Sequence, residues 1–431
     1  MERARDIAVI GAGAVGVSVA LALARQAGGD GSTVTCIDAE APGSGASRGN
    51  AGVIVAGGAL PLAMPGATRE ALGLMVGRDR ALRIGLAHLT GFLPWARRAF
   101  ATATTPAVAA AAKALDSLAT PAADLWRADL DDADAARLIT ESRFVFASRH
   151  GPIDAEALTW RLKRQYGVQL RVLDRAGLAA LEPALSPAYR DAIAMEGMAR
   201  LRDPQAATGA LARTMLRQGG TILRAAVTAV RRDGARWRLA MAPPDGPPRD
   251  LAADIVVVAA GWASARLLRP LGLDIPLEAE HGRHVMLPAG DVEIANSVMD
   301  FGARMVASRM EGGIRLAGSS AFTGPGTPPE AERDLPAMLR IATRMFPGID
   351  VSGAVPWAGS RPSLPDSLPA IGPVPGHPGL WAAFGHGHYG LTMAPATGRL
   401  VAAMIRGAPS NIDPRPFDPA RFLDRDAAAR A

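Results

Sequence analysis

The sequence predicts an α/β protein in which a nucleotide-binding domain is interrupted by a second domain that contains an antiparallel sheet. Three observations lead to this prediction: a glycine-rich turn follows a short apolar run, residues 67–138 carry apolar side chains at helical spacing, and strand patterns resume later in the chain. The 431 residues are enough for two or three domains, and a hydrophobic content of 49% indicates a globular protein.

The charge and cysteine content exclude several classes of protein. The net charge is +6, but the cations are scattered and few aromatic residues lie among them, which argues against a nucleic-acid partner. Cys36 is the single cysteine, so we expect neither an internal disulfide nor a multi-cysteine metal site. No signal region is visible, and no apolar run reaches the roughly 18 residues of a membrane span. We therefore expect a cytoplasmic protein; peripheral binding to the inner membrane stays open.

The glycine-rich turn predicts a phosphate-binding site. Residues 6–10 form an apolar run suited to a buried parallel strand, three glycines follow in G-x-G-x-x-G spacing, and a helix is expected over residues 14–27. The first glycine permits the tight turn, the second lets the backbone approach a pyrophosphate, and the third lets the helix pack closely. The helix N-terminus favours an anion, although a glycine-rich turn without a ligand is the alternative. The predicted contacts are Gly11, Gly13, Ala14, Val15 and Gly16.

A second strand over residues 33–38 strengthens this prediction. It ends at Asp38, 22 residues after Gly16, where a carboxylate accepts hydrogen bonds from an adenosine ribose and disfavours a 2′-phosphate. Cys36 lies within this strand and is expected to be a small buried hydrophobic residue.

The next segments favour FAD over NAD as the bound dinucleotide. An NAD-dependent dehydrogenase would continue with alternating strands and helices, whereas here a small-residue loop over 43–66 leads into the helices of 67–138. The nucleotide-binding pattern resumes with two strands in residues 221–241 and a buried strand that runs into Gly261. A nucleotide-binding domain that is split in this way is typical of FAD proteins.

At this point the sequence resembles the FAD-dependent D-amino-acid oxidase superfamily, closest to the bacterial D-amino-acid dehydrogenase small-subunit group. Seven blocks follow in family order, among them "VIGAGAVGVSVALALA", "SRGNAGVIVAGGALPLAMPG", "PWAGSRPSLPDSLPAIGP" and "GLWAAFGHGHYGLTMAPATGRLVAAMI". The resemblance implies a split, Rossmann-like FAD-binding domain of the GR2 type and a substrate domain built on an antiparallel sheet with a helical insertion. The expected FAD-binding parts are residues 1–66, 199–275 and 355–431, and the expected substrate-domain parts are residues 67–198 and 276–354.

The resemblance also implies a reaction. FAD would take a hydride at N5 from the α-carbon of a D-amino acid or a related amine acid, such as a hydroxyproline isomer, and electrons would pass to a quinone or another acceptor. The segment "LPWARRAF" has an interfacial character that motivates a quinone at a membrane surface. An oxygen-using oxidase of secondary amine acids, of the glycine or sarcosine kind, is the first alternative, and a non-catalytic flavoprotein is the second. Non-covalent FAD is expected, and the oligomeric state does not follow from the sequence.

Arg361 is the leading candidate for substrate binding. It lies in a proline-rich stretch, residues 356–373, which is expected to be a stiff loop. By resemblance its guanidinium binds the substrate carboxylate through two parallel bonds, and it also contacts the cofactor. A structural salt bridge to Asp366 is the alternative.

The segment "FGHGHYGLT" supplies further candidates. By resemblance, a helix that begins at Thr392 stabilises negative charge on the reduced flavin through its N-terminus. His388 and Tyr389 are candidate catalytic residues, with packing as the alternative. A metal site is the rival interpretation, but no Asp, Glu or Cys lies nearby in the sequence. The predicted cofactor contacts in this segment are Gly387, His388, Gly390, Leu391 and Thr392.

Two departures from the family pattern leave the substrate open. Many relatives have Gly-Thr-x-Glu-Phe where this chain has residues 318–322, so the carboxylate is missing at Ala321. His284 stands where relatives often have an aromatic residue, and it is a candidate for hydrogen bonding to the substrate; a polar position on a solvent-facing sheet is the alternative.

The remaining candidates come from loops around the expected flavin. Ser47 and Asn50 would line the loop beside the isoalloxazine ring, although both residue types also cap loops. Arg48 would neutralise the pyrophosphate or would be a surface charge. The other predicted cofactor contacts are Asp38, Ala39, Ala51, Gly52, Val227, Ala260, Gly261 and Trp262.

Overall fold

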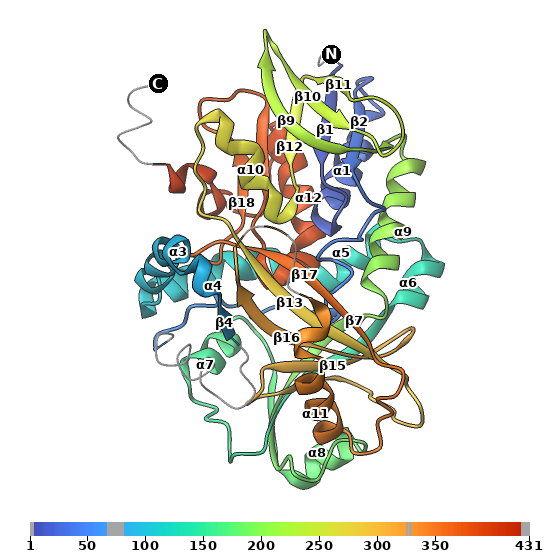
Figure 1. The fold of residues 1–431 in the computed structure, drawn as a ribbon, viewed down its shortest axis with the longest axis vertical. Helices are drawn as coiled ribbons and strands as arrows, with labels where there is room; N and C mark the ends of the chain where they lie inside the picture. The colour runs from blue at the N-terminus through green and yellow to red at the C-terminus, as the bar shows by residue number, and fades with distance from the viewer. Residues whose placement is uncertain (1–3, 67–81, 325, 327–329, 424–431) are drawn as a thin grey trace.

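A computed structural model describes residues 4–66, 82–324, 326 and 330–423. The described residues form two main sheets that follow one another along the long axis of the molecule (Figure 1). The six-stranded sheet with its helices lies at the top of this view, and the ten-stranded sheet lies below it. The predicted mixed α/β fold with a second, sheet-based part is confirmed.

The six-stranded sheet is a parallel nucleotide-binding sheet with one antiparallel edge strand. Its order is β18-β19-β12-β1-β2-β8, and only the β18–β19 pair is antiparallel. Strand β1 lies between β2 and β12 and pairs in parallel with both. Open α/β sheets bind their ligands at the carboxyl ends of such central strands. The strands are β1 (Asp6–Ile10), β2 (Thr33–Asp38), β8 (Thr221–Arg224), β12 (Ile255–Val258), β18 (Ala370–Pro373) and β19 (Leu380–Phe384).

Both faces of this sheet are covered, and successive side chains of β1 point alternately into the two cores. Ile7 and Val9 face a core built with helices, and Ala8 and Ile10 face a core built with a small antiparallel sheet. Gly398 permits the close approach of two of these helices, since a Cβ there would lie 2.3 Å from the Ser18 carbonyl oxygen. The helices are α1 (Ala14–Ala27), α9 (Pro204–Arg217) and α12 (Gly390–Arg406), and the small sheet has β9 (Ala226–Asp233), β10 (Arg236–Ala242) and β11 (Arg249–Ala253).

The number of strands in residues 221–241 differs from the prediction. They contain three strands rather than two, because β8 joins the parallel sheet before the chain turns into the β9–β10 hairpin. The expected turn is present, one residue later than predicted, at Gly234 and Ala235.

The helical insertion has the predicted type over most of its length. Side-chain caps start two of its helices: Thr104 accepts a hydrogen bond from the Ala107 amide and Asp131 accepts one from the Asp134 amide. Residues 82–84 form a short strand, β4 (Leu82–Ile84), rather than a helix, and the predicted helix over 67–81 lies outside the described residues. The helices are α3 (Leu89–Ala101), α4 (Thr105–Ala119), α5 (Ala122–Asp129) and α6 (Asp132–Leu138).

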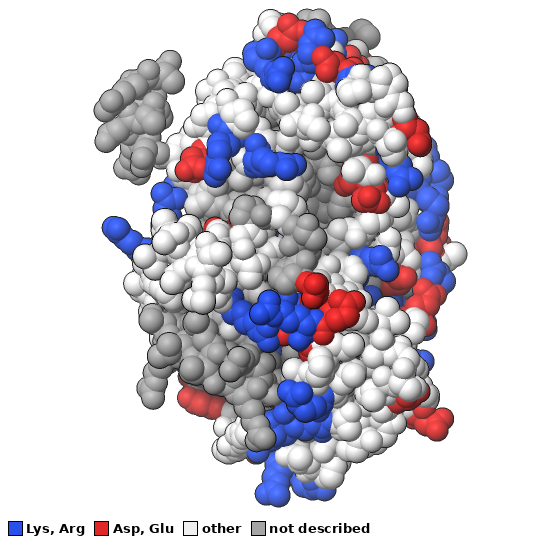
Figure 2. Space-filling model, viewed as in Figure 1, with Lys and Arg blue, Asp and Glu red and all other residues white. Residues whose placement is uncertain are grey.

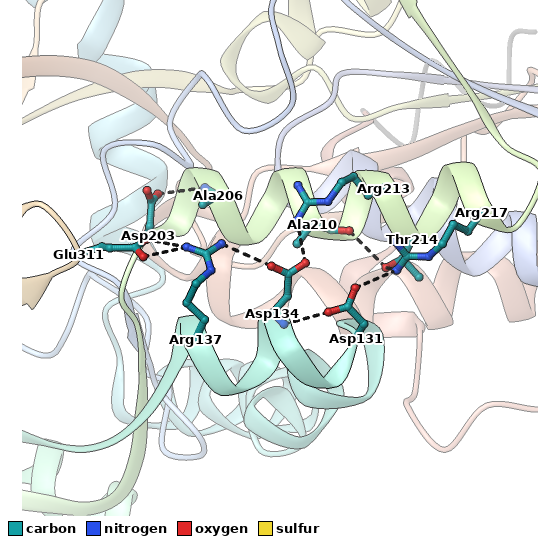
Figure 3. Close-up of polar contacts among 10 residues, drawn as sticks. All are labelled: Asp131, Asp134, Arg137, Asp203, Ala206, Ala210, Arg213, Thr214, Arg217 and Glu311. Carbon is teal, nitrogen blue, oxygen red and sulfur yellow. Dashed lines mark hydrogen bonds and ion pairs between the residues drawn. The ribbon is translucent and has the colours of Figure 1, made fainter.

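Ion pairs join this insertion to the nucleotide-binding part, as Figure 3 shows. Asp134 of α6 lies 2.7 Å from Arg213 of α9, and Asp131 lies 3.4 Å from Arg217 of the same helix. Arg137 reaches Glu311, beyond α9, at 2.8 Å. Solvent screens each of these pairs, so their main effect is to fix the direction of α6 relative to α9.

The ten-stranded sheet carries the second part of the molecule. Its order is β17-β13-β16-β15-β14-β5-β7-β3, with β4 on β16 and β6 on β7. Helices α8 (Arg175–Leu181) and α11 (Leu335–Met345) cover one face, and α7 (Leu158–Gln165) packs on the other. The strands are β3 (Val53–Ile54), β5 (Ile139–Ser148), β6 (Leu170–Leu173), β7 (Asp191–Leu201), β13 (Glu278–Leu287), β14 (Ser297–Asp300), β15 (Met305–Met310), β16 (Gly313–Phe322) and β17 (Val355–Ser363).

The prediction of a loop over residues 356–373 is wrong, because its first half is strand β17. Among the strands that the structure describes, this one pairs with β13 only, apart from a single bridge between Ser363 and His386, and so lies at an edge of the sheet. An edge strand tolerates Pro356 and Pro362, since the missing amide hydrogen atoms cost no hydrogen bond between strands. Arg361 is therefore held on a strand.

The surface in Figure 2 carries its charges in small groups. On this face Lys and Arg lie beside Asp and Glu rather than in one continuous basic area. Among the described residues, no helix combines the length and the apolar content that crossing a lipid bilayer requires.

Candidate active site

A cavity of about 1450 Å³ lies between the two large sheets. Its walls come from the carboxyl ends of β1, β2 and β12 on one side and from β5, β13, β16 and β17 on the other. Of the predicted site residues, Gly16, Arg48, Gly52 and His284 do not line it. The predicted residues that line it are Gly11, Gly13, Ala14, Val15, Asp38, Ala39, Ser47, Asn50, Ala51, Val227, Ala260, Gly261, Trp262, Arg361, Gly387, His388, Tyr389, Gly390, Leu391 and Thr392.

The three glycines of the turn are required for different structural reasons. Gly11 has a φ of 107°, and a Cβ there would lie 2.3 Å from the Ala259 carbonyl oxygen. A Cβ on Gly16 would lie 1.9 Å from the Gly11 carbonyl oxygen, so this glycine allows α1 to pack against the turn. Gly13 is different: the nearest atom to its Cβ would be Ser47 Oγ at 3.6 Å. The protein itself leaves room at Gly13, on the side that faces the cavity.

Asp38 and Ser47 close the same end of the cavity. The Asp38 carboxylate accepts hydrogen bonds from the Ala12 amide at 2.6 Å and the Glu40 amide at 3.0 Å, which fixes its orientation at the end of β2. Ser47 Oγ accepts a hydrogen bond from the Ala14 amide at 3.0 Å. The first turn of α1 has no acidic residue, so the positive end of this helix remains suited to an anionic ligand.

The loop after Ser47 is held by Arg315, a residue that the sequence did not single out. Arg315 is 8% exposed and donates to the carbonyl oxygen atoms of Arg48 at 2.7 Å and Asn50 at 2.6 Å. The Asn50 side chain accepts from the Gly52 amide at 2.7 Å, which matches the loop-capping alternative. The Arg48 side chain is exposed, which favours the surface-charge alternative.

His284 is not placed for the predicted contact with substrate. It is 3% exposed, its ring stacks on Trp357 at a centroid distance of 4.9 Å, and its Nδ1 donates to the Gly49 carbonyl oxygen at 3.2 Å. Burial lowers the pKa of His284 from 6.5 to about 3, and nearby Arg315 adds to this effect. His284 therefore supports the loop that contains Gly49 from behind the cavity wall, so neither the substrate contact nor the solvent-facing position describes it.

The buried histidines predict an acid-labile fold. Burial also lowers the pKa of His386 to about 3. The unfolded chain binds these protons below about pH 6.5 whereas the folded protein does not, so stability falls as the pH falls, by about 2 kcal/mol per histidine between pH 7 and pH 5. Urea unfolding of a His284→Phe variant, which keeps a stacked ring, is expected to show a pH dependence smaller by this amount. An unchanged pH dependence would contradict the assignment.

Side chains at the start of α12 hold residues 55–60, the loop that follows β3. Helix α12 begins at Gly390, two residues earlier than predicted, and its first turn has no acidic residue. The Tyr389 hydroxyl accepts from the Leu60 amide at 3.2 Å, and Thr392 Oγ1 accepts from the Val55 amide at 3.2 Å. Both side chains thus tie residues 55–60 to the helix, while the helix N-terminus points at the cavity as an anion-stabilising end.

Arg361 reaches the cavity from β17. Its Nη1 donates to Glu280 Oε1 at 3.2 Å and to the Ser319 carbonyl oxygen at 3.3 Å. Gly282 makes room for the guanidinium, since a Cβ there would lie 2.3 Å from Arg361 Nη2. The alternative of a salt bridge to Asp366 is wrong, because Asp366 pairs with Arg421 at 2.7 Å.

Glu280 is a second residue that the sequence analysis missed. It is 2% exposed, and His388 Nε2 lies 3.2 Å from its Oε1, so a carboxylate does stand beside the histidine segment. Burial alone raises the pKa of the Glu280 carboxyl, but His388, Arg361 and the Ser320 hydroxyl together outweigh burial and hold this pKa well below its ordinary value. The signal in the sequence was a glutamate inside the strand pattern "EAEHGRHVML".

An aromatic wall borders these charges. Phe92 and Trp95 of α3 pack on Phe322 of β16, with ring centroids 4.6 and 5.3 Å from it. Trp95 Nε1 donates to the Ser363 carbonyl oxygen at 3.1 Å, which fastens the helix to the strand that carries Arg361. All three rings line the cavity, so an apolar surface faces the cations.

Lys163 is a further cavity residue without a sequence signal. Its Nζ donates to the Gly58 carbonyl oxygen at 2.6 Å, and burial lowers the pKa of Lys163 to about 8.

Cys36 is buried on β2, and burial raises the pKa of its thiol to about 12, so it is not a nucleophile. Among the described residues, no group of three or more His, Cys, Asp or Glu side chains is placed to hold a metal ion.

Comparison with known proteins identifies the family. Residues 6–404 match the family described as "DAO: FAD dependent oxidoreductase". The chain belongs to the DAO family of FAD-dependent oxidoreductases. A D-amino-acid oxidase of Bradyrhizobium diazoefficiens is 36% identical over 98% of this chain and 100% of its own length. A protein named D-amino acid dehydrogenase 2 of Mesorhizobium japonicum is 29% identical over 95% and 98%.

Solved structures agree on the DAO fold. A glycine oxidase from Geobacillus kaustophilus superposes with a TM-score of 0.71 at 22% identity, covering 98% of this chain and 100% of that one. An L-proline dehydrogenase from P. horikoshii gives a TM-score of 0.69 at 20% identity, covering 98% of both chains. At these identities the likeness shows the fold alone.

The residues present fit the FAD cofactor of the DAO family. The turn at Gly13 is open toward the cavity, the first turn of α1 has no acidic residue, and Asp38 presents an oriented carboxylate at the end of β2. These features suit a pyrophosphate and an adenosine ribose. The start of α12, a helix that packs against α1, supplies a second positive helix end at the cavity. The chain is therefore an FAD-dependent oxidoreductase.

Proposed function

We propose that the protein oxidatively deaminates D-amino acids or closely related amine acids. The observation that carries this proposal is Arg361, a cation on a rigid strand in the wall of the FAD cavity, with a guanidinium suited to one carboxylate. The names of the relatives from Bradyrhizobium and Mesorhizobium support a D-amino acid as the substrate. The aromatic wall of Phe92, Trp95 and Phe322 supports an apolar side chain.

The roles of the residues follow from their positions. Bound FAD supplies the two-electron oxidation by accepting a hydride. Arg361 holds the substrate carboxylate, which sets the position of the α-carbon. The N-terminus of α12 stabilises negative charge on its side of the cavity, and Tyr389 and Thr392 keep the adjoining loop in place. We also propose that FAD is held without a covalent bond and that residues 1–66, 199–275 and 355–431 supply the cofactor domain, apart from β3 and β17, which belong to the ten-stranded sheet.

Anaerobic flavin bleaching tests the proposal. The purified yellow protein is mixed with D-alanine, D-phenylalanine, D-proline derivatives, glycine and sarcosine, and the loss of flavin absorbance is followed by stopped flow. D-amino acids with apolar side chains are expected to reduce the flavin fastest. Preference for sarcosine or glycine would favour a secondary-amine oxidase instead, and no reduction by any amine acid would favour a non-catalytic flavoprotein.

We further propose a quinone at a membrane surface as the electron acceptor. Support comes from the exposed apolar side chains of Leu86, Leu93 and Phe100, which are 90, 62 and 41% exposed; the latter two line the cavity. Exposed Arg97 and Arg98 lie beside them and suit anionic lipid. The protein would then be cytoplasmic with peripheral binding to the inner membrane. Oxygen is the second candidate acceptor, favoured by the oxidase name of the Bradyrhizobium relative.

A single variant, Leu86→Ser, at a residue outside the cavity wall, tests the acceptor. Reduction of a ubiquinone analogue in anionic vesicles is expected to fall by about tenfold, because the apolar area that inserts is lost. Anaerobic flavin reduction should stay unchanged. Leu216→Ser on α9, at a residue that is 46% exposed, is the matched control. Rapid peroxide production without quinone reduction in the unmodified protein would overturn the quinone proposal.

A further inference from the structure

A buried carboxylate stands directly behind the cation that the proposed function uses. Glu280 lies on β13, opposite Arg361 of β17 and opposite Phe322 of β16. It is 2% exposed, yet it borders the cavity. A charge in such a place is costly unless it is fully paired, so its partners show what it does.

Every oxygen of Glu280 is engaged. Its Oε1 accepts from Ser320 Oγ at 2.5 Å, from Arg361 Nη1 at 3.2 Å and from His388 Nε2 at 3.2 Å. Its Oε2 accepts from Ser363 Oγ at 2.6 Å. With four donors around it, the carboxylate has little capacity left for a substrate amine. It is therefore a positioning group for Arg361 and His388 rather than a ligand.

The guanidinium is oriented by this contact. Both of its hydrogen bonds, to Glu280 and to the Ser319 carbonyl oxygen, use Nη1. Among the described residues no acceptor engages the Nε–Nη2 edge, which is the edge that forms a parallel pair of bonds with a carboxylate. Ser319 has a φ of 58°, a costly conformation for serine, and this conformation aims its carbonyl oxygen at Arg361.

The charges of the group balance in a specific way. Glu280 cancels the charge of Arg361, and His388 adds one positive charge only when it is protonated. The group therefore carries a net charge of one at most, which matches a single carboxylate. Arg283, another cation of the cavity wall, is paired with Asp334 at 2.6 Å.

We propose that Glu280 is a specificity-determining residue: it positions Arg361 and His388 and restricts the site to amine acids with one carboxylate. This inference rests on the proposed function. A second carboxylate on the substrate would approach a group whose positive charge the first carboxylate has already balanced, so acidic D-amino acids are disfavoured.

The test compares two substrates of equal shape, D-aspartate and D-asparagine, on the FAD-bound protein. In Glu280→Gln the D-aspartate to D-asparagine ratio of kcat/KM is expected to rise by about tenfold or more, because one negative charge beside the site is removed. A positional role alone would lower both values together. Glu182→Gln, at a fully buried carboxylate that is bonded to Asn296 and lies outside the cavity wall, is the matched control and should leave the ratio unchanged.

A binding measurement makes the result independent of turnover. Flavin absorbance is titrated with propionate and with malonate, and Glu280→Gln should bind malonate more tightly relative to propionate. If Glu280→Gln does not retain FAD, His388→Gln carries the test, since loss of this partner leaves the Glu280 carboxylate less well balanced and should lower the D-aspartate ratio further. An unchanged ratio in an active variant overturns this inference alone. Failure of every amine acid to reduce the flavin of the unmodified protein overturns the proposed function.

Discussion

Replacing Arg361 by alanine is expected to lower kcat/KM for the amine acid by about a hundredfold to a thousandfold while FAD stays bound. The variant loses a charge-assisted pair of bonds to the substrate carboxylate and leaves Glu280 with one cation fewer. The FAD cradle at Gly13 and Asp38 belongs to the other sheet and is not touched. Anaerobic flavin reduction at rising substrate concentration measures the effect.

Two controls separate substrate binding from damage to the fold. Arg421→Ala removes an arginine that pairs with Asp366 outside the cavity wall, and it should leave kcat/KM nearly unchanged. Arg361→Lys keeps the charge but not the planar fork, so its value should lie between those of the alanine variant and the unmodified protein. Arg361→Ala with unmodified kinetics would return this residue to a structural role.

Replacing Gly13 by valine is expected to abolish FAD binding in a protein that still folds. A Cβ at this position meets nothing closer than Ser47 Oγ at 3.6 Å, and the backbone there (φ −68°, ψ 175°) suits any residue. The added methyl groups would instead fill the place where a pyrophosphate approaches the backbone. The flavin absorbance of the purified protein, together with its circular dichroism, measures both parts of the prediction.

The other end of the same helix supplies the control for Gly13. Gly28→Val, at the C-cap of α1 where no atom lies within 4 Å of a Cβ, should keep the flavin. In contrast, Gly16→Val should disturb folding itself, because its Cβ would overlap the Gly11 carbonyl oxygen. Full flavin content in Gly13→Val would show that the turn does not hold the pyrophosphate.

The cofactor part of the site was predictable because its signals are local in sequence. The turn, the helix over 14–27 and the carboxylate of Asp38 fall within one β-α-β segment, and the structure brings them together at one end of the cavity. The Ala12–Asp38 hydrogen bond joins residues only 26 positions apart, although Gly11 also lies against Ala259 of a distant segment.

The substrate part was not predictable in the same way because its contacts join distant strands. Glu280 and Arg361 are 81 positions apart and meet only through the β13–β17 pairing, which the expectation of a loop over 356–373 concealed. Arg315 and Asn50 are separated by 265 positions. His284 was misjudged because a sequence shows which face of a strand a residue takes but not what packs on that face.

Gly282 couples two positions that a designer would wish to vary separately. The Arg361 guanidinium occupies the space that a Cβ on residue 282 would need. Any side chain introduced at 282 would displace that guanidinium, even one chosen only to reshape the cavity for a larger substrate. Libraries that aim to change the preferred amine acid should therefore hold residue 282 fixed and diversify the Phe92 and Trp95 wall, where space can change while the charges stay in register.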